Sequence, residues 1–546
     1  MSTDAVETAN QSPAYENVDL FGSDLPLREA VTAHGGAGET AALAAFGRRW
    51  GSAEMLEQAR LANENPPRLR TFDARGNRSD VVEFHPAYHG FMAESIAAGL
   101  HASTWQPDAT RAAAPAEVAR AARFYMVAQV ENGHMCPITM TRAAVAALAV
   151  EPAVAAALMP KVLSRDYDRR FLPWPDKRGI TLGMGMTEKQ GGTDVRANTT
   201  RAERSGEHYR LTGHKWFMSA PMCDAFVVLA QAPDGLTCFL LPRFCPDGSV
   251  NALRFQRLKE KLGNRSNASA EVEFADAFAW RIGQEGKGVR TILQMVQLTR
   301  LDCAISSAGM MRAALSRAVL HCRYRSVFQK RLVDQPMMRA VLADLALESE
   351  GALALTMRLC RAFDAAKSTP LDEARARLLT PAVKYWVCKT APNFVYETME
   401  CLGGNGYVEE GTLARLYREA PVNAIWEGSG NVMCLDVLRV IGRDGDEARA
   451  VLAEIARETA GLPGAARALA AIEPLFGAAA EAEARVAVEW LARLTAAAAL
   501  KASAPGAVAE AFARTRLLDV RGSLWGAAAL TGSERELPIQ RALPPG

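Results

Sequence analysis

The chain has 546 residues, of which 49% are hydrophobic and 23% charged, and its formal net charge is +2. This length exceeds what a single hydrophobic core supports, so we expect several domains. The composition excludes an intrinsically disordered protein, and the small net charge excludes a global attraction to nucleic acid or anionic membranes. Any such binding requires a local patch of charge.

In chain order, the sequence predicts helices, then strands, then helices. From about residue 27 to residue 172, Ala, Leu, Met, Glu and Arg recur at helical spacing. Residues 181–288 contain short β-rich runs between glycine turns and a Pro-Asp-Gly turn, which predicts a compact β domain. Helical periodicity resumes at Val289, runs to about Ile441 and is followed by an alanine-rich helical section. Because strands and helices do not alternate, the pattern does not favour a doubly wound nucleotide fold.

The cysteines and the N-terminus indicate the compartment. The ten cysteines are scattered singly, without a Cys-x-x-Cys pair, which favours reduced thiols in the cytoplasm. The polar, acidic stretch from Met1 to about Leu27 does not resemble a secretory signal. No run reaches about 18 uninterrupted apolar residues, so we predict no transmembrane helix, no membrane partner and a cytoplasmic location.

A glycine-rich segment, Gly183-Met-Gly-Met-Thr-Glu-Lys-Gln-Gly-Gly-Thr-Asp194, precedes the β-rich runs. Its spacing does not fit the Rossmann fingerprint, because strands follow it instead of a helix. Glycines let backbone amides approach a ligand, and Thr187 and Thr193 add hydroxyl donors for flavin carbonyl or phosphate oxygens. A glycine-rich turn without a ligand is an equally weighted alternative.

A second segment places a carboxylate just before a predicted helix. Leu402-Gly-Gly-Asn-Gly-Tyr407 is followed by Ile425-Trp-Glu-Gly-Ser-Gly-Asn431, in which Glu427 stands between Trp and Gly. The glycines permit tight turns, and a helix N-terminus favours an anion. The alternative is a helix N-cap with a solvated Glu427.

Together these motifs resemble the acyl-CoA dehydrogenase family. Gly213-His-Lys-Trp-Phe-Met-Ser219 and Arg325-x-x-Phe328 complete a set of five motifs in register over about residues 110–440. Within the family the chain most resembles the AidB-like branch, flavoproteins of the bacterial adaptive response to DNA alkylation. Residues 187–192, 261–269 and 425–431 resemble that branch most strongly.

The resemblance implies an α+β, mostly α architecture of four domains. These are an N-terminal helical domain (1–180), a central β-barrel domain (181–288), a C-terminal four-helix bundle (289–442) and an appended helical domain (443–546) that is a candidate for DNA binding. The resemblance also implies a homotetramer, a dimer of dimers, with FAD between barrel and bundle.

Site residues follow from the same resemblance. The residues expected to bind FAD are Met184, Gly185, Met186, Thr187, Gly191, Gly192, Thr193, Trp216, Phe217, Met218, Ser219, Ile425, Trp426, Gly428, Ser429, Gly430 and Asn431, with Arg325 and Gln335 reaching FAD across a subunit interface. Glu427 is expected to remove the substrate α-proton as the catalytic base, with β-hydride transfer to flavin N5. Desolvation in a flavin-walled cleft would raise the pKa of this carboxyl. Some relatives carry the base on a bundle helix, but the matching residue is Thr299, which cannot serve.

Several departures from the family predict weak activity on acyl-CoA. An Asp-x-x-Arg pair that usually helps hold CoA reads Gln297-Leu-Thr-Arg300, so Arg300 is kept as a candidate substrate contact without its acid. The Arg-x-x-Phe-Gly motif ends in Gln329, and Glu400 stands where Gln is usual. Trp426 replaces a Tyr, contacts the substrate in our prediction and would narrow the acyl pocket.

The sequence also contains candidate residues for a metal site and for a DNA-binding site. His85 and His89 are spaced i, i+4 but have no third ligand nearby, so we expect no metal site, and His134 reads as a core residue. The competing function is a flavoprotein that binds double-stranded DNA and protects or repairs it during alkylation stress. Residues 443–546 are balanced in charge, so this function rests on a local patch of Arg514, Arg516 and Arg521, for which a salt-bridged surface is the alternative. A nitroalkane-oxidase-like activity is disfavoured, because that relative uses Asp where this chain has Glu427.

Overall fold

The computed structural model describes residues 10–106, 115–477, 480–519 and 524–543. The chain forms two compact units. The helical unit comprises Met1–Leu56, Ala113–Val130 and Cys303–Gly546, and the barrel unit comprises Glu57–Ala112 and Glu131–Asp302.

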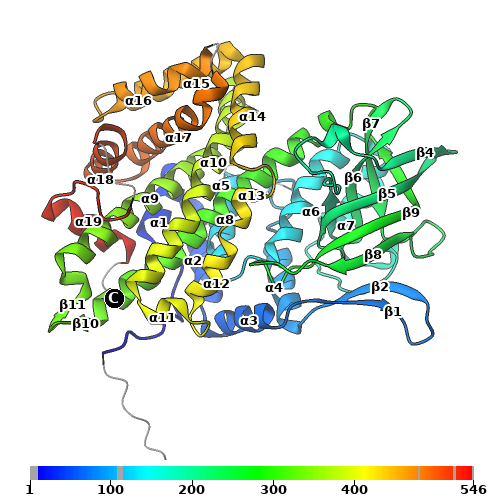
Figure 1. Ribbon diagram of the computed structural model, residues 1–546, viewed down its shortest axis with the longest axis horizontal. Helices are drawn as coiled ribbons and strands as arrows, with labels where there is room; N and C mark the ends of the chain where they lie inside the picture. Colours follow the sequence, from blue (N-terminus) through cyan, green and yellow to red (C-terminus); the bar gives the residue numbers. More distant parts are fainter. Residues whose placement is uncertain (1–9, 107–114, 478–479, 520–523, 544–546) are drawn as a thin grey trace, which may run out of the picture. The chain divides into compact units, whose positions relative to one another are not determined.

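Seven strands form the core of the barrel unit (Figure 1). They are β3 (Leu182–Gly185), β4 (Arg201–Ser205), β5 (His208–Ser219), β6 (Ala225–Ala232), β7 (Gly235–Pro242), β8 (Leu253–Leu258) and β9 (Ser269–Ile282). Strand β6 pairs with β4 at one side and β7 at the other, so the ring β6–β4–β5–β9–β7 closes on itself. Strands β6 and β7 are continuous apolar runs, because the barrel interior and the covering elements bury both faces. The predicted β barrel is confirmed.

A β-hairpin interrupts the segment for which the sequence predicted only helices. Strands β1 (Arg68–Phe72) and β2 (Arg78–Glu83) are antiparallel, and Gly76 turns between them at φ 82°. Buried Asp80 anchors the hairpin, since it accepts hydrogen bonds from Arg78 (2.7 Å) and from the Phe255 amide of the barrel (3.2 Å). That distant contact is invisible to helical periodicity, which is why the hairpin was missed.

The barrel unit also contains helices. They are α4 (Pro86–Ala97), α6 (Met135–Leu148) and α7 (Pro152–Val162), together with the parts of α3 (Ala53–Glu64) and α8 (Gly288–Tyr324) that belong to this unit. Helix α6 packs against β3, where the Thr141 hydroxyl accepts a hydrogen bond from the Leu182 amide (3.0 Å). This contact fixes the strand that leads into the glycine-rich segment.

The helical unit is built on the long helices α8, α9 (Pro336–Ala365) and α10 (Pro370–Cys401). Its N-terminal helices are α1 (Leu25–Ala33), α2 (Thr40–Trp50) and α5 (Ala116–Ala128). After α10 come α11 (Gly404–Tyr407), α12 (Thr412–Glu419), α13 (Val422–Ile425), α14 (Gly430–Arg443), α15 (Gly445–Glu458), α16 (Ala465–Ile472), α17 (Ala480–Ser503), α18 (Gly506–Ala513) and α19 (Gly532–Ala542). Helix α17 packs on α9, α10, α14 and α16, and α19 packs on α9 (Figure 1). No helix among the described residues is apolar and long enough to cross a membrane.

Buried ion pairs bind the C-terminal helices to α9. Arg516 pairs with Asp344 (2.5 Å) and Glu348 (2.8 Å), and Arg541 pairs with Glu350 (2.6 Å). Each of these acids lies on the buried face of α9, so losing an arginine would strand a charge in the core. The C-terminal section is therefore an integral part of the helical unit.

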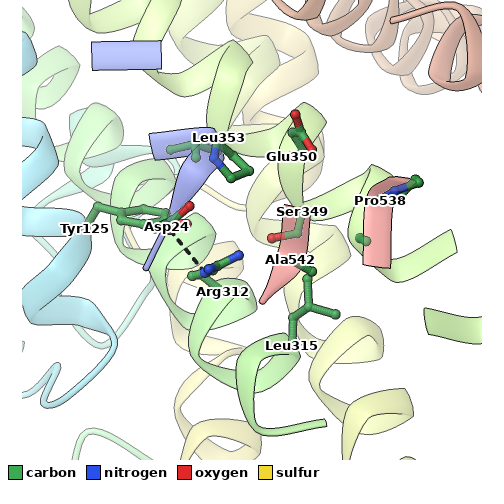
Figure 2. Close-up of a pocket in the computed structure, with 11 residues that line it drawn as sticks. Asp24, Tyr125, Arg312, Leu315, Ser349, Glu350, Leu353, Pro538 and Ala542 are labelled. Atoms are coloured by element: carbon green, nitrogen blue, oxygen red, sulfur yellow. Dashed lines mark hydrogen bonds and ion pairs between the residues drawn. The ribbon is translucent and has the colours of Figure 1, made fainter. Parts of the chain in front are cut away.

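The helical unit contains a small cavity of about 10 Å³, lined by both polar and apolar residues. Figure 2 shows the residues around it. Arg312 pairs there with Asp24 (3.1 Å), which also accepts a hydrogen bond from the Tyr125 hydroxyl (3.2 Å). The three groups tie α8, α5 and the start of α1 together. None of the predicted site residues lines this cavity.

Candidate active site

The glycine-rich segment is anchored in the barrel unit by a buried ion pair. Glu188 accepts hydrogen bonds from Lys215 Nζ (2.9 Å) and from the Thr199 and Thr200 amides (2.6 and 3.2 Å), and both charged side chains are fully buried. Burial would raise the pKa of Glu188, but the hydrogen bonds and the charge of Lys215 outweigh it and lower this pKa to about 2. The pair therefore locks the Met-Thr-Glu motif onto the Gly-His-Lys-Trp strand.

The two motifs predicted to bind flavin lie side by side. The Trp216 amide donates to the Thr187 carbonyl oxygen over 2.8 Å, and the Ser219 hydroxyl is 3.0 Å from that of Ser269. The Lys259 ammonium lies over the Trp216 ring, 3.3 Å from its centroid, which fixes the indole by a cation–π contact. Phe217 is 49% exposed, whereas the Met218 side chain is buried in the barrel, so Met218 can meet a ligand only through its backbone.

This surface has the groups that a flavin requires. A Cβ on Gly192 would collide with the Thr187 hydroxyl, so the cradle needs glycine there. Met184, Met186 and Thr187 are partly exposed, and Gly192 and Thr193 are exposed. Threonine hydroxyls and backbone amides are therefore accessible to a ligand beside the exposed ring of Phe217. Hydroxyl and amide donors suit flavin carbonyl and phosphate oxygens, and the apolar ring suits the isoalloxazine. The residues fit FAD.

In the helical unit, Glu427 has a left-handed backbone. Its φ is 58°, and Gly428 follows at 101°, after which Gly430 begins α14. Such a conformation is uncommon outside glycine, costs of order 1–3 kcal/mol and tends to be retained at functional sites. Asn431 is exposed and accepts a hydrogen bond from Arg485 (3.1 Å). The turn therefore holds the predicted base just before the N-terminus of α14.

The residue before the base is fixed by a buried amide. Trp426 Nε1 donates to Asn423 Oδ1 (2.9 Å), and Asn423 Nδ2 lies 3.2 Å from the hydroxyls of both Ser306 and Ser307 on α8. Ile425 is exposed, and Trp426 is half-buried. Sequence reasoning missed Asn423, because nothing in the local sequence shows that this amide is buried.

Arg325 and Gln335 bracket a two-stranded hairpin, β10 (Ser326–Val327) and β11 (Lys330–Arg331). Gln335 Nε2 donates to the Val327 carbonyl oxygen (3.0 Å), and Arg325 donates to the Asn10 carbonyl oxygen (3.0 Å). Gln329, which replaces the family glycine, has φ 63° and thus adopts a glycine-like backbone. The replacement keeps the turn.

Gln297, Thr299 and Arg300 lie on the part of α8 that belongs to the barrel unit. Thr299 is buried and donates to the Val296 carbonyl oxygen (2.9 Å). Arg300 is largely buried, and the buried Oε1 of Gln297 accepts no hydrogen bond from any described residue. A buried oxygen without a hydrogen-bond donor could accept a hydrogen bond from a ligand, for example from an amide N–H.

The structure corrects the proposed arginine patch. Arg516 is 3% exposed and paired with two carboxylates, so the prediction that it contacts DNA is wrong. Arg514 is half-buried and pairs with Glu534 (2.5 Å) and Asp519 (3.6 Å), and Arg521 lies outside the described residues. A charge pattern does not reveal which arginines meet acids far away in the chain.

The histidines have structural roles. His85 accepts a hydrogen bond from the Ala87 amide at the start of α4, and His89 lies 2.9 Å from the Tyr167 hydroxyl. His134 is buried between Glu131 (2.6 Å) and Ser95 (2.9 Å). In the part of the chain that the structure describes, no three His, Cys, Asp or Glu side chains gather as a metal site.

Comparison with known proteins decides the family. Residues 10–169 match the adaptive response protein AidB N-terminal domain, and residues 183–277 and 286–442 match the middle and C-terminal domains of acyl-CoA dehydrogenases. The putative acyl-CoA dehydrogenase AidB of Escherichia coli K12 is 53% identical over 80% of each chain. The chain belongs to the AidB-like branch of the acyl-CoA dehydrogenase family.

A further sequence match and a solved structure agree. Acyl-CoA dehydrogenase family member 11 of Caenorhabditis elegans is 32% identical over 73% of this chain and 66% of its own. The crystal structure of C. elegans ACDH-11 in complex with C11-CoA superposes with a TM-score of 0.84 and 26% identity, covering 99% of this chain and 97% of that one. The AidB-like protein is thus an acyl-CoA dehydrogenase-like oxidoreductase, and FAD is the cofactor of its family.

Proposed function

We propose that this flavoprotein dehydrogenates a small acyl-CoA or related thioester slowly, with Glu427 as the base that removes the α-proton. The left-handed turn at Glu427 carries this proposal, because strain at a carboxylate needs a compensating role. FAD, when bound, supplies the two-electron acceptor. A relative solved with C11-CoA supports the ligand class.

In the barrel unit, the segments Met184–Gly185–Met186–Thr187, Gly191–Gly192–Thr193 and Trp216–Phe217–Met218–Ser219 would hold the cofactor. In the helical unit, residues 425–431 would carry the base and the turn that positions it. Trp426 would limit the acyl group. Arg300 would contact the CoA portion, as would the buried Oε1 of Gln297, three residues before it.

The test is anaerobic mixing of purified protein with a panel of short and branched acyl-CoA esters, followed by flavin absorbance. Wild type should bleach more slowly than the median enzyme rate of about 10 s⁻¹. Glu427→Gln keeps the shape of the side chain but cannot take the proton, so bleaching should slow by about 10²–10⁴-fold at unchanged FAD content. Equal rates in the two proteins would place the base elsewhere.

We also propose a homotetramer, a dimer of dimers, in which Arg325 and Gln335 reach the FAD of a partner subunit. Phe328 and Met337 lie within three residues of these two positions and are 93% and 86% exposed. Exposing such large apolar side chains to water is unfavourable for an isolated chain and is typical of an interface. Light scattering after gel filtration should give four chains for wild type and fewer for Phe328→Ser. A monomeric wild type would contradict the assembly. The cytoplasmic location stays a prediction.

A second candidate function is binding to double-stranded DNA through the C-terminal helices. The match to an adaptive response domain motivates it. Arg467 and Lys501 are exposed and donate to backbone carbonyl oxygens of Leu518 (2.6 Å) and Ala460 (2.9 Å). Because carbonyl oxygens carry no net charge, these hydrogen bonds do not neutralise the two cations. Both side chains could therefore attract a DNA phosphate.

A further inference from the structure

Helix α10 contains a buried lysine beside the turn of the proposed base. Lys384 is 1% exposed, and its ammonium donates a hydrogen bond to the Gly428 carbonyl oxygen over 2.6 Å. Lysines are seldom fully buried, because desolvating the ammonium is costly. A buried lysine that holds a single loop carbonyl indicates a specific task for that contact.

The carbonyl that Lys384 holds belongs to the peptide directly after Glu427. Glu427 and Gly428 are two consecutive residues in the left-handed region, at φ 58° and 101°. A left-handed glutamate relaxes unless its surroundings oppose it. The hydrogen bond from Lys384 pins the C-terminal side of this turn to α10.

The N-terminal side of the turn is pinned to α8 by a related contact. Asn423 Nδ2 lies 3.2 Å from the Ser307 hydroxyl, which donates to Cys388 Sγ over 3.4 Å. Cys388 lies one helical turn beyond Lys384 on α10. Buried polar contacts thus join the loop to α8 before Trp426 and Glu427 and to α10 after them.

We propose that Lys384 is a positioning residue for proton abstraction, which acts by holding the Gly428 carbonyl oxygen and so fixing the left-handed turn that aims Glu427. This inference rests on the proposed role of Glu427 as the base. A carboxylate displaced by about 1 Å loses on the order of 10²-fold in rate, so the contact has a measurable consequence.

The experiment measures proton removal apart from oxidation. A 3-oxoacyl-CoA has an acidic α-proton, and its enolate, formed when the base takes that proton, absorbs in the near ultraviolet. Lys384→Met removes the donor and keeps an unbranched side chain that is one atom shorter. We expect enolate formation slowed by about 10²-fold, FAD content unchanged and the Kd for the ester within about threefold of wild type. Lys384→Arg, which restores a donor, should recover part of the rate. Lys367→Met, at an exposed position just before the same helix, should behave as wild type.

Crystal structures of wild type and Lys384→Met separate this inference from the proposed function. The inference expects Glu427 to leave the left-handed region in the variant, and an unchanged turn with a wild-type rate would overturn it. If wild type itself forms no enolate, Glu427 is not the base, while the structures still decide whether Lys384 holds the turn. Should Lys384→Met fail to fold, Lys384→Gln takes its place, because its shorter side chain cannot reach the carbonyl. A Gln variant with wild-type rate and turn would overturn the inference in the same way.

Discussion

The indole of Trp426 is tied to Asn423, three residues earlier, by a 2.9 Å hydrogen bond from Nε1 to Oδ1. Because Asn423 is itself buried against two serines of α8, the bulkiest side chain beside the base has one fixed orientation. Asn423 would not touch the substrate itself. By orienting Trp426 it would nevertheless set the width of the acyl pocket, and this effect can be tested.

Asn423→Leu should release the indole and widen the range of acyl groups. We expect esters with longer or branched chains to bind about tenfold more tightly relative to short ones, since one methylene is worth ~1–3 kcal/mol in an apolar pocket. Measuring Kd across an acyl-CoA series checks this result. Trp426→Phe should give a similar profile, and the double variant should add little, because both changes remove the same contact. Additive effects would refute the coupling.

Gln297→Asp should restore the acid that relatives pair with arginine at this place. The buried acceptor would then be charged and would strengthen contacts to the amide donors of CoA. We expect CoA esters to bind about tenfold more tightly, equivalent to ~1.4 kcal/mol. Titration calorimetry of wild type, Gln297→Asp and the apolar control Gln297→Leu ranks them. A Leu variant that binds as well as Asp would show that this position does not meet CoA.

Glu188→Gln should destabilise the flavin segment, since it leaves Lys215 buried without its counter-charge. Breaking a buried pair costs about 3–5 kcal/mol, and we expect a lower Tm and weaker retention of FAD. Glu203 on β4 gives the control, because Glu203→Gln replaces an exposed carboxylate of the same barrel and should leave both quantities near wild type. Spectra before and after dialysis measure bound FAD. Retention equal to wild type in Glu188→Gln would exclude a role for this pair in the cofactor site.

Asp364 should give the stability of the helical unit an unusual dependence on pH. Its carboxylate accepts hydrogen bonds from the Glu117 and Val118 amides at the start of α5, and burial raises its pKa from 3.8 to about 6. Between these values the folded state binds more protons than the unfolded one, so this contribution to stability falls as pH rises from about 4 to 6.

Asp364→Asn removes that titration while keeping one acceptor. The stability of the variant relative to wild type should therefore increase from pH 4 to pH 7, by up to about 3 kcal/mol for a shift of about two units. Thermal unfolding of both proteins across this range measures the difference. A difference that stays constant with pH would mean that the carboxyl is not perturbed.

DNA binding through the C-terminal helices should respond to Arg467→Ser/Lys501→Ser. Each lost phosphate contact should flatten the slope of log affinity against log salt by about 0.9. Arg449→Ser/Arg457→Ser removes the same charge from arginines that already pair with Glu473 and Glu454, so its slope should match wild type. Identical slopes in all three proteins, or no binding at low salt, would remove this function.

The sequence by itself determined the features that depend on short-range patterns. The compact β domain follows from runs of β-branched and aromatic residues between glycine turns. The family follows from five motifs of a few residues each, and the expectation that the β domain is a barrel came with that resemblance. Glu427 and the flavin segments were named by motif, because tight turns and close backbone approach demand glycine at fixed spacing. Whether these residues meet substrate and FAD is what the experiments above test.

Only the tertiary structure decided which charged and polar groups are buried and with whom. Arg516 was predicted to contact DNA, yet it pairs with Asp344, 172 residues earlier in the chain. Lys384 and Asn423 bear no local sign that they hold the turn around Glu427, and the β1–β2 hairpin depends on a hydrogen bond from Phe255 to Asp80. The physical reason is common to all of them. The cost of burying a polar group depends on partners that the fold brings from distant positions, and no periodicity within a short window records those partners.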